Sequence, residues 1–438
     1  MASNETTLPT RQKFLEFGGS LKTIFPFDKE WTNLNHAYRV QSEARPCSFA
    51  LYDYATPLDA SRKALETLVN APPETVVLVG NATEGVNTVF RNLRWNQDGK
   101  DVIIFFSTIY EACAKITDYV VDYNGAGTVN SKEIHLDYPL EDAEIIQRFR
   151  KAVAEVQAEG KRARVCVFDV VSSKPGIVFP WEELCKVCKE LGVLSLVDGA
   201  QGIGMVNLDL QKADPDFFTS NCHKWLFVPR GCAMFYVPVR NQHMIETTLA
   251  TSHGYVPKTA NRGTPLPPNG RSAFVSNFQF TGTRDLSGFL AVKDAIAWRR
   301  DACGGEERIR AYIWDLNKRG TKLVAEKLGT SVLENSKGTL TNCGMGNVAL
   351  PIWIGEGKDA KAGDAVIAEG DVTAVKQFMF RVMMDEYSTF MMLFTIADRL
   401  WVRISAQIYL DIKDYEFAAR VLEDACKRVA AGEYKKDN

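Results

Sequence analysis

The sequence has little of what would place the protein in a membrane or on nucleic acid. No apolar run is long enough to span a bilayer, and the first residues, MASNETTLPTRQKF, lack the apolar core of a signal peptide. The formal net charge is −2, so no basic excess is available to bind nucleic acid or an anionic membrane. We therefore expect a cytoplasmic protein without nucleic-acid or membrane partners.

Signals for metal and for disulfides are also weak. The ten cysteines are spread over 438 residues, and no secretory segment accompanies them, so disulfides are not expected. Cys185 and Cys188 form a C-x-x-C pair, but a second pair or paired histidines to complete a zinc site are missing. Their segment has helical apolar spacing, so we expect both sulfurs to pack on one helix face, without metal.

Nucleotide-binding motifs are missing as well. No GxxxxGK[ST] occurs, and GIGMV (202–206) lacks the third glycine of a dinucleotide fingerprint. A nucleotide-dependent activity is therefore not predicted.

What the sequence does contain is an alternation of apolar strands and amphipathic helices between about residues 58 and 290. This alternation predicts an α/β fold, with a mainly parallel sheet that helices cover on both faces. The expected strands are Thr75–Gly80, Asp101–Phe106, Arg164–Asp169, Val193–Val197, Asp216–Thr219 and Cys232–Val237. The expected helices are Leu58–Val69, Thr83–Leu93, Ala143–Ala158 and Trp181–Leu191.

The pattern changes after Leu290 and is typical of a smaller α+β domain. The expected helices there are Ala291–Ala302, Glu306–Leu328, Val372–Glu386 and Asp414–Ala431, with strands near Asn347–Ile354 and Leu400–Ile408. The segment 355–371 is expected to be an exposed loop. We thus expect an N-terminal segment of residues 1–45 that packs on the small domain, a large domain of 46–290 and a small domain of 291–438.

Asp198 and Lys224 follow two successive expected strands, in the segments SLVDGAQG and SNCHKWLFVPRG. Asp198 taken alone is compatible with a turn residue, and Lys224 with a surface lysine beside Trp225. Side chains at successive strand ends of an α/β sheet face the same crevice. A lysine that forms a Schiff base and a carboxylate against a pyridine nitrogen are what pyridoxal phosphate requires. Together the two residues predict this cofactor.

The segment VLVGNATEGVNTVFRNL (77–93) predicts a strand, a turn of small residues and a helix. Backbone N–H groups of Ala82, Thr83 and Glu84 at the helix start would suit a phosphate. A simple N-cap is the alternative, but the phosphate interpretation is favoured once Lys224 is considered. FQFTGTRD (278–285) is compatible with a second phosphate contact or with a plain loop.

Two further residues have an ordinary and a functional interpretation. Tyr110 follows an expected strand and could pack on the sheet end, stack on the cofactor or donate a proton to a leaving group. Arg403 interrupts the apolar strand LWVRISAQIYL; it could face solvent or an acid, or bind the carboxylate of an amino-acid substrate.

These residues, in this order, resemble the class V aminotransferase family of fold-type-I pyridoxal phosphate enzymes, across about residues 45–435. The likeness is greatest to the isopenicillin N epimerase-like branch, and within it to the fungal hercynylcysteine sulfoxide lyases of ergothioneine biosynthesis. It rests on the segments EARPCSF, TIYEACAK, DVVSSKPG, VDGAQGIGMV, SNCHKWLFVPRGCAMFYVPVRNQ, TSHGYVP and RISAQIYL. The chain departs from the family at LNHAY (34–38), which leads directly into EARPC without an intervening turn.

The resemblance implies how the cofactor is held. Lys224 would form the Schiff base, Asp198 would face the pyridine nitrogen, and Gln201 would hydrogen-bond the phenolic oxygen. The phosphate would be held by Ala82, Thr83, Asn221, His223 and, from a neighbouring subunit, Thr283. The last contact implies a homodimer with shared active sites.

The resemblance also implies a reaction. Arg403 would bind the substrate α-carboxylate, Lys224 would remove the Cα proton and Tyr110 would serve as the acid, while Ser172 and Ser173 would lie near cofactor or substrate. The implied activity is a lyase that cleaves a carbon–sulfur bond in a cysteine-derived sulfoxide such as hercynylcysteine sulfoxide, with release of pyruvate and ammonia.

Several alternatives stay open at this point. The same cofactor supports epimerisation, cysteine desulfuration or an alkaloid-forming condensation, and a non-catalytic scaffold is the alternative from another class. For a desulfurase, Cys343 in TLTNCGMGN is the candidate nucleophile, although its surroundings do not match that family's cysteine motif.

Overall fold

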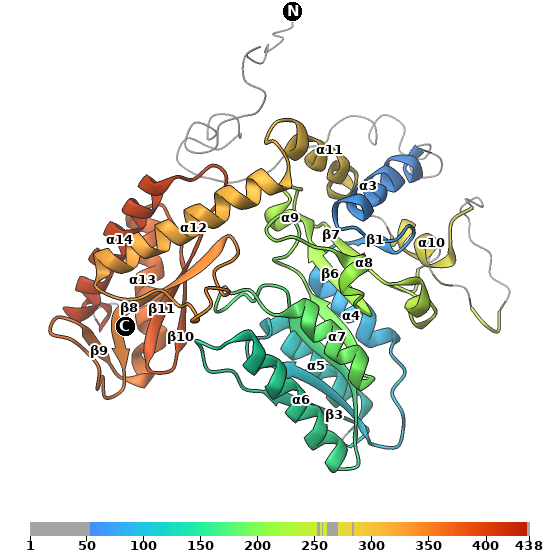
Figure 1. The fold of residues 1–438 in the computed structure, drawn as a ribbon, viewed down its shortest axis with the longest axis horizontal. Helices are drawn as coiled ribbons and strands as arrows, with labels where there is room; N and C mark the ends of the chain where they lie inside the picture. The colour runs from blue at the N-terminus through green and yellow to red at the C-terminus, as the bar shows by residue number, and fades with distance from the viewer. Residues whose placement is uncertain are drawn as a thin grey trace, which may run out of the picture.

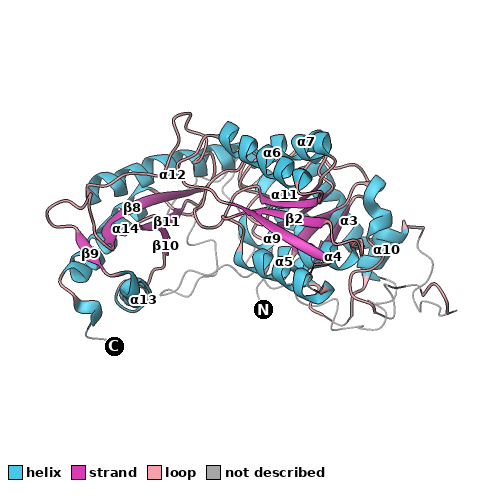
Figure 2. Ribbon diagram, turned by 90° about the horizontal axis from the view of Figure 1, so that it is seen from below, coloured by secondary structure: helices cyan, strands magenta, loops and turns pink. Residues whose placement is uncertain are grey.

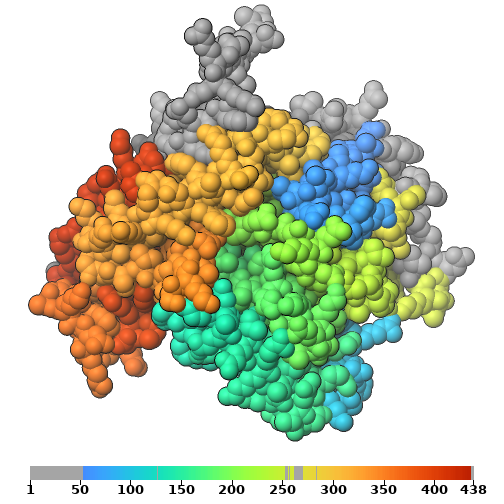
Figure 3. Space-filling view, in the orientation of Figure 1, coloured from blue at the N-terminus to red at the C-terminus, as the bar shows by residue number. Residues whose placement is uncertain are grey.

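The structure is a computed structural model that describes residues 53–125, 127–251, 255, 257–260, 270–282 and 284–435. These residues form a seven-stranded sheet and a four-stranded sheet. The long helix α12 (Glu306–Leu328) runs from the larger part to the smaller one (Figure 1). In the space-filling view, the orange and red carboxy-terminal part lies directly against the green central part (Figure 3).

The larger sheet is mainly parallel, as the sequence predicts. Its strand order is β1-β7-β6-β5-β4-β2-β3, and β7 runs in the opposite direction to the other six strands. The strands are β1 (Val76–Val79), β2 (Asp101–Phe106), β3 (Val129–Ile134), β4 (Arg162–Asp169), β5 (Leu194–Asp198), β6 (Phe217–Asn221) and β7 (Ala233–Tyr236). The sequence analysis missed the edge strand β3, because its residues VNSKEI are largely polar and only its two ends are buried.

Helices cover both faces of this sheet (Figure 2). One face packs on α4 (Ala82–Asn92), α5 (Glu111–Asn124) and α10 (Ala273–Gln279). The other packs on α3 (Ala55–Leu68), α6 (Asp142–Ala158) and α7 (Trp181–Leu191). Alternate residues of each central strand therefore enter different cores: Val165 and Val167 face the α4–α5 side, whereas Cys166 and Phe168 face α6 and α7.

The smaller sheet has the order β10-β11-β8-β9. Its strands are β8 (Met345–Ile354), β9 (Ala365–Ile367), β10 (Met392–Ile396) and β11 (Arg399–Ser405), and α13 (Val372–Arg381) and α14 (Ile412–Ala430) accompany them. The expectation of a plain loop over 355–371 was wrong, because β9 lies within it and pairs with β8.

Helix α11 (Ser287–Asp301) contacts α3, so the expected boundary at residue 290 falls inside a helix of the large part. The division into three domains stays a prediction, since residues 1–52 lie outside those that the structure describes. The LNHAY departure falls in the same undescribed segment.

Buried cysteines contribute to packing. Cys185 and Cys188 both lie in the core on α7, and every cysteine in the described ranges is a buried free thiol. Within those ranges, three or more His, Cys, Asp or Glu side chains are nowhere arranged to hold a metal ion. Nor does any described helix combine the length and apolar character needed to cross a membrane.

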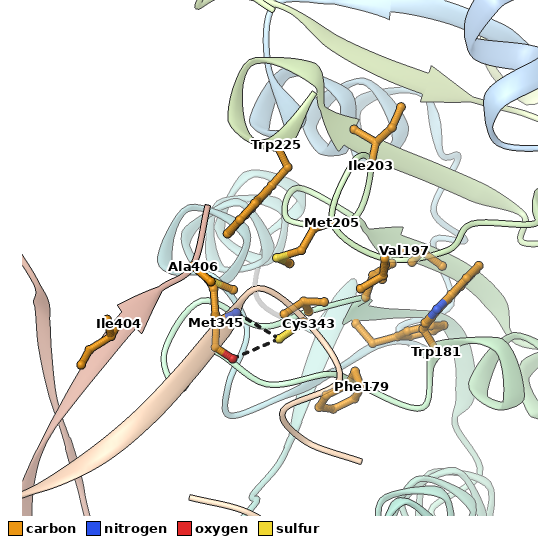
Figure 4. Packing of buried hydrophobic residues seen from close by; sticks show 14 of the residues in the cluster. Phe179, Trp181, Val197, Ile203, Met205, Trp225, Cys343, Met345, Ile404 and Ala406 are labelled. Atoms are coloured by element: carbon orange, nitrogen blue, oxygen red, sulfur yellow. Dashed lines mark hydrogen bonds between the residues drawn. The ribbon is translucent and has the colours of Figure 1, made fainter. Parts of the chain in front are cut away.

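The two parts meet at a buried cluster that includes Trp225, Met345 and Cys343 (Figure 4). On the side of the larger sheet, the fully buried guanidinium of Arg299 stabilises this contact. Arg299 donates to the carbonyl oxygens of Trp225 and Gly204 at 2.8 and 2.9 Å and pairs with Glu306. Because a buried cation needs such partners, the backbone around Trp225 is held firmly.

Gly320 offers a test of packing between α12 and α14. Alanine is normally favoured in a helix by about 1 kcal/mol, but a Cβ at residue 320 would lie 2.3–2.5 Å from ring carbons of the buried Tyr415. We predict that Gly320→Ala lowers the free energy of unfolding by about 1–3 kcal/mol, as measured by urea denaturation. Gly370→Ala, where no atom lies within 4 Å, should be nearly neutral. Equal stability of the two variants would contradict the packing argument.

Candidate active site

Asp198 and Lys224 lie in one crevice at the carboxyl ends of the central strands. Asp198 is the last residue of β5, and Lys224 belongs to the short helix α9 (Cys222–Trp225), directly after β6. The Asp198 carboxylate is close enough to act on the pKa of Lys224. The structure therefore brings together the two residues on which the cofactor prediction rests.

The Asp198 side chain is buried, and its carboxyl oxygens accept two hydrogen bonds. Only 2% of the residue is exposed. Its Oδ1 accepts the Ala200 N–H at 2.8 Å, and its Oδ2 accepts the thiol of Cys113, on α5, at 3.3 Å. Both oxygens of this carboxyl group thus have a hydrogen-bond donor, an environment that suits a negative charge. The sequence analysis missed Cys113, because no pattern in the chain links it to Asp198.

Lys224 is the cation of the crevice. Part of the residue is in contact with solvent, but the protein atoms around its amine desolvate that group and lower its pKa. The Asp198 carboxylate acts in the opposite direction, and Arg403 adds to the lowering. The Nζ atom lies 5.9 Å from the centroid of the Tyr110 ring, at the start of α5. Tyr110 is 43% exposed, so its ring forms a wall of the crevice and is not a core residue.

The start of α4 differs from the expected set of free N–H groups. The N–H of Glu84 donates to the side chain of Asn81 at 2.8 Å, and that of Ala82 donates to Asn221 Oδ1 at 2.9 Å. Thr83 keeps an N–H without a partner among the described residues. Asn221 thus joins the end of β6 to the helix start, and its amide NH₂ and the Thr83 N–H remain as donors.

A cation also lies beside the start of α4. A Cβ on Gly80 would meet the Arg284 guanidinium at 2.4 Å, so glycine is what allows this side chain to approach. Arg284 lies 3.6 Å from the Glu84 carboxylate. The sequence analysis missed Arg284, although it stands next to the predicted Thr283, which lies outside the described residues. A helix start with an adjacent guanidinium suits a phosphate.

Gln201 and His223 are oriented by neighbours on the same loops. Gln201 Oε1 accepts the indole N–H of Trp225 at 2.7 Å, which leaves its amide NH₂ as a donor. The Nδ1 atom of His223 lies 2.8 Å from the carbonyl oxygen of Cys232, and burial lowers the pKa of the ring.

Arg403 reaches the crevice from β11 of the smaller sheet. Its Nη1 donates to the carbonyl oxygen of Ser173 at 2.5 Å and to the hydroxyl of that residue at 3.1 Å. Its Nε is buried without a hydrogen-bond partner, and no described carboxylate lies within 4 Å of the guanidinium. Burial lowers the pKa of Arg403. A partly exposed guanidinium without a carboxylate partner suits a substrate carboxylate.

Asn347 fixes the loop that meets Arg403, and the sequence analysis missed it. It is the β8 register partner of Arg403 and is fully buried. Its side chain accepts the N–H of Gly176 at 2.8 Å and donates to the carbonyl of Gly176 at 2.9 Å. Ser172, expected near cofactor or substrate, donates its hydroxyl to the Pro175 carbonyl and thus stabilises the turn.

The residues present fit pyridoxal phosphate. The crevice offers an amine for the aldehyde, a buried anion for the ring nitrogen, an amide NH₂ for the phenolic oxygen and a helix start with a guanidinium for the phosphate. Arg403 Nη2, which binds no described residue, is available to an amino-acid carboxylate.

Known proteins resemble this chain over most of its length. The family model Aminotransferase class-V matches residues 45–349. The L-cysteine desulfhydrase-like protein lolT1 of Epichloe uncinata is 32% identical, over 96% of this chain and 98% of that protein. The hercynylcysteine sulfoxide lyase of Schizosaccharomyces pombe is 26% identical, over 94% of this chain and 98% of that protein.

A solved structure supports the fold. The cystine C-S lyase C-DES, in complex with its reaction product cysteine persulfide, superimposes with a TM-score of 0.62 at 19% identity. The match covers 85% of this chain and 87% of that one. Because the family model matches residues 45–349 and lolT1 is 32% identical, the chain belongs to the class V aminotransferase family, whose members are pyridoxal phosphate enzymes.

Proposed function

We propose that the protein is a pyridoxal phosphate-dependent lyase that cleaves the carbon–sulfur bond of a cysteine-derived sulfoxide. The substrate is of the hercynylcysteine sulfoxide type, and the products are a sulfenic acid, pyruvate and ammonia. A place in ergothioneine biosynthesis, a cytoplasmic location and a homodimer that shares Thr283 between subunits belong to the same proposal.

The observation that carries the proposal is the arrangement of Lys224 and Tyr110. The Lys224 amine lies over the Tyr110 ring, 5.9 Å from its centroid, so the residues proposed as base and acid are neighbours. Elimination needs both, because a proton leaves Cα and a proton is added to the departing group. An epimerase would not need an acid directed at a leaving group.

The reaction then follows from the residues. Pyridoxal phosphate, when bound, supplies an aldehyde that reacts with amines and a ring that withdraws electrons from Cα. Lys224 accepts the Cα proton at Nζ, and its lowered pKa makes the unprotonated amine more abundant near neutral pH. Tyr110 donates its hydroxyl proton to the leaving sulfoxide as the Cβ–sulfur bond breaks. Water then hydrolyses the remaining three-carbon fragment to pyruvate and ammonia, so the reaction needs no oxidant.

A residue of the smaller sheet, Arg403, would orient the substrate. Arg403 would pair with the α-carboxylate through Nη2, which binds no described residue, while Ser173 occupies Nη1 and limits the rotation of the guanidinium. The Asp198 anion would keep the ring nitrogen protonated, which the electron-withdrawing role of the ring requires.

A hollow beside Tyr110 supports a substrate larger than cysteine. It has a volume of about 380 Å³ and shares Tyr110 and Ser173 with the crevice. A free cysteine has only hydrogen on its sulfur and would leave this space unused. Charged side chains line the hollow, which suits a polar substituent: Glu111, Lys115, Asp118, Glu133 and Lys174.

A cysteine desulfurase is the weaker alternative. That activity needs a reactive cysteine, and Cys343 was the sequence candidate. The residue is fully buried, its thiol donates to the Met345 carbonyl at 3.2 Å, and burial raises its pKa to about 12 (Figure 4). A thiol of that pKa is hardly ionised at neutral pH and is a poor nucleophile.

The direct test is to assay the purified protein, loaded with pyridoxal phosphate, for pyruvate release. We expect hercynylcysteine sulfoxide to give a higher kcat/KM than L-cysteine, and Lys224→Ala to release none. A higher kcat/KM with L-cysteine would indicate a desulfhydrase, the activity in the name of the lolT1 relative. Inactivity of the loaded protein on both compounds would reject the lyase.

Tyr110→Phe tests the acid. Removal of the hydroxyl should lower kcat for the sulfoxide by about 10²–10⁴-fold, the usual contribution of a general acid. Release of pyruvate from β-chloro-L-alanine should be spared, because chloride leaves without a proton. If both substrates slow by the same factor, Tyr110 acts in a step other than departure of the sulfur.

Ala114→Phe tests the hollow. Ala114 is a half-buried residue of α5 that lines it. A phenyl ring there should take up part of the space and reduce kcat/KM for hercynylcysteine sulfoxide by about tenfold or more. The rate with β-chloro-L-alanine, which does not extend beyond Tyr110, is the internal control. A uniform loss on both compounds would mean that the hollow does not bind the sulfur substituent.

A further inference from the structure

A second acid lies beside Asp198 on the same face of the sheet. Asp169 ends β4, and in the parallel β4–β5 ladder it is the register partner of Asp198. Val165 and Val167 precede it on the α4–α5 side, and Leu196 precedes Asp198 on that side. Because side chains alternate along a strand, both carboxyl groups point to the face that α5 covers. Adjacent strands are about 4.8 Å apart, so the two acids are neighbours.

The surroundings of the two acids are unequal. Asp198 accepts hydrogen bonds from the Ala200 N–H and from the Cys113 thiol. Asp169 is only 5% exposed, yet no described residue donates a hydrogen bond to its carboxyl group, and no described Lys or Arg nitrogen lies within 4 Å of it. A buried carboxylate without a donor or a cation is unstable as an anion.

We propose that Asp169 is held as a neutral carboxylic acid beside the Asp198 carboxylate, so that the pair carries one negative charge and one proton into the crevice. We assign the charge to Asp198 and the proton to Asp169 because the two hydrogen-bond donors, the Ala200 N–H and the Cys113 thiol, both donate to Asp198. Two close carboxylates in a buried site cannot both ionise at low cost, and the one with hydrogen-bond donors keeps the charge.

Electrostatics around Asp169 agree with this assignment. Burial raises its pKa well above the ordinary value, and the negative charge of Asp198 raises it further. Lys224, on α9, acts in the opposite direction but does not compensate for the burial. The other titratable groups that face Asp169 are the Cys113 thiol on α5 and the Tyr138 hydroxyl before α6, and both are neutral at pH 7.

The consequence for the site is a fixed charge. With Asp169 neutral, the crevice presents a single anion to the ring nitrogen and a carboxyl O–H that can donate to an oxygen of a bound molecule. With Asp169 ionised, two anions would act on Lys224 and raise its pKa, so a smaller fraction of its amine would be unprotonated near neutral pH. Asp169 is thus a positioning residue that holds the local charge at one unit.

Infrared spectroscopy can detect the proton directly. In the cofactor-free protein at pH 7.5, the spectrum of wild type minus Asp169→Asn should contain the C=O stretching band of a protonated carboxyl group. The corresponding difference for Asp198→Asn should instead contain the bands of an ionised carboxylate. An ionised-carboxylate signature for Asp169 would overturn the proposal, and it would leave the lyase assay unaffected.

Thermal unfolding against pH provides a second readout. The pKa of Asp169 is higher in the folded protein than its unfolded value of about 3.9. Folding must therefore bind a proton at Asp169, and this requirement destabilises the folded state increasingly as pH rises above 4. Asp169→Asn removes that penalty and should raise Tm at pH 7.5 by about 2–4 °C, with a gap that closes as pH falls toward 4.

Asp101→Asn is the matched control. Asp101 is also a fully buried strand aspartate, but it accepts hydrogen bonds from Arg162 and Asn96 at 2.7 and 2.9 Å. Its replacement should lower Tm at pH 7.5. If Asp169→Asn lowers Tm as Asp101→Asn does, then Asp169 is an ionised, partnered residue and the proposal fails.

Discussion

A buried negative charge at the end of β5 constrains everything around it. The Asp198 carboxylate is almost fully shielded from water, and desolvation of a charge is costly unless hydrogen bonds or a cation compensate for it. The Ala200 N–H and the Cys113 thiol provide the first kind of compensation, and Lys224 nearby provides the second. A protonated pyridine nitrogen would complete it. The cofactor site is thus also the place where the fold has an unbalanced charge.

The proposed carboxylate site depends on contact between the two sheets. Arg403 belongs to the smaller sheet, but its guanidinium is fixed by Ser173, in the loop that follows β4 of the larger sheet. Asn347, its neighbour on β8, binds the same loop through both hydrogen bonds to Gly176. The carboxylate site therefore exists only when the two parts are packed together.

The sequence predicted the framework of the site better than its fine structure. Apolar strands and a conspicuous Asp–Lys pair predicted the parallel sheet and the crevice, because alternation and strand ends are local signals. The N–H groups of Ala82 and Glu84 were expected to be free, but side chains of Asn221 and Asn81 occupy them. Such pairings depend on long-range packing, which leaves no periodicity in the chain. The same holds for Asp169, whose importance comes only from its register with Asp198.

The charges of the crevice also suit the proposed amino-acid substrate. Arg403 and Lys224 are two cations in partly desolvated surroundings, and the positive charge of Arg403 contributes to the lowered pKa of Lys224. A substrate carboxylate on Arg403 would cancel that charge, so the pKa of the amine would rise when the substrate is seated. Lys224 would then bind the Cα proton more strongly at the moment when one must be removed. A ligand without a carboxylate would leave the amine a weaker base, so recognition and proton transfer are linked through one electrostatic interaction.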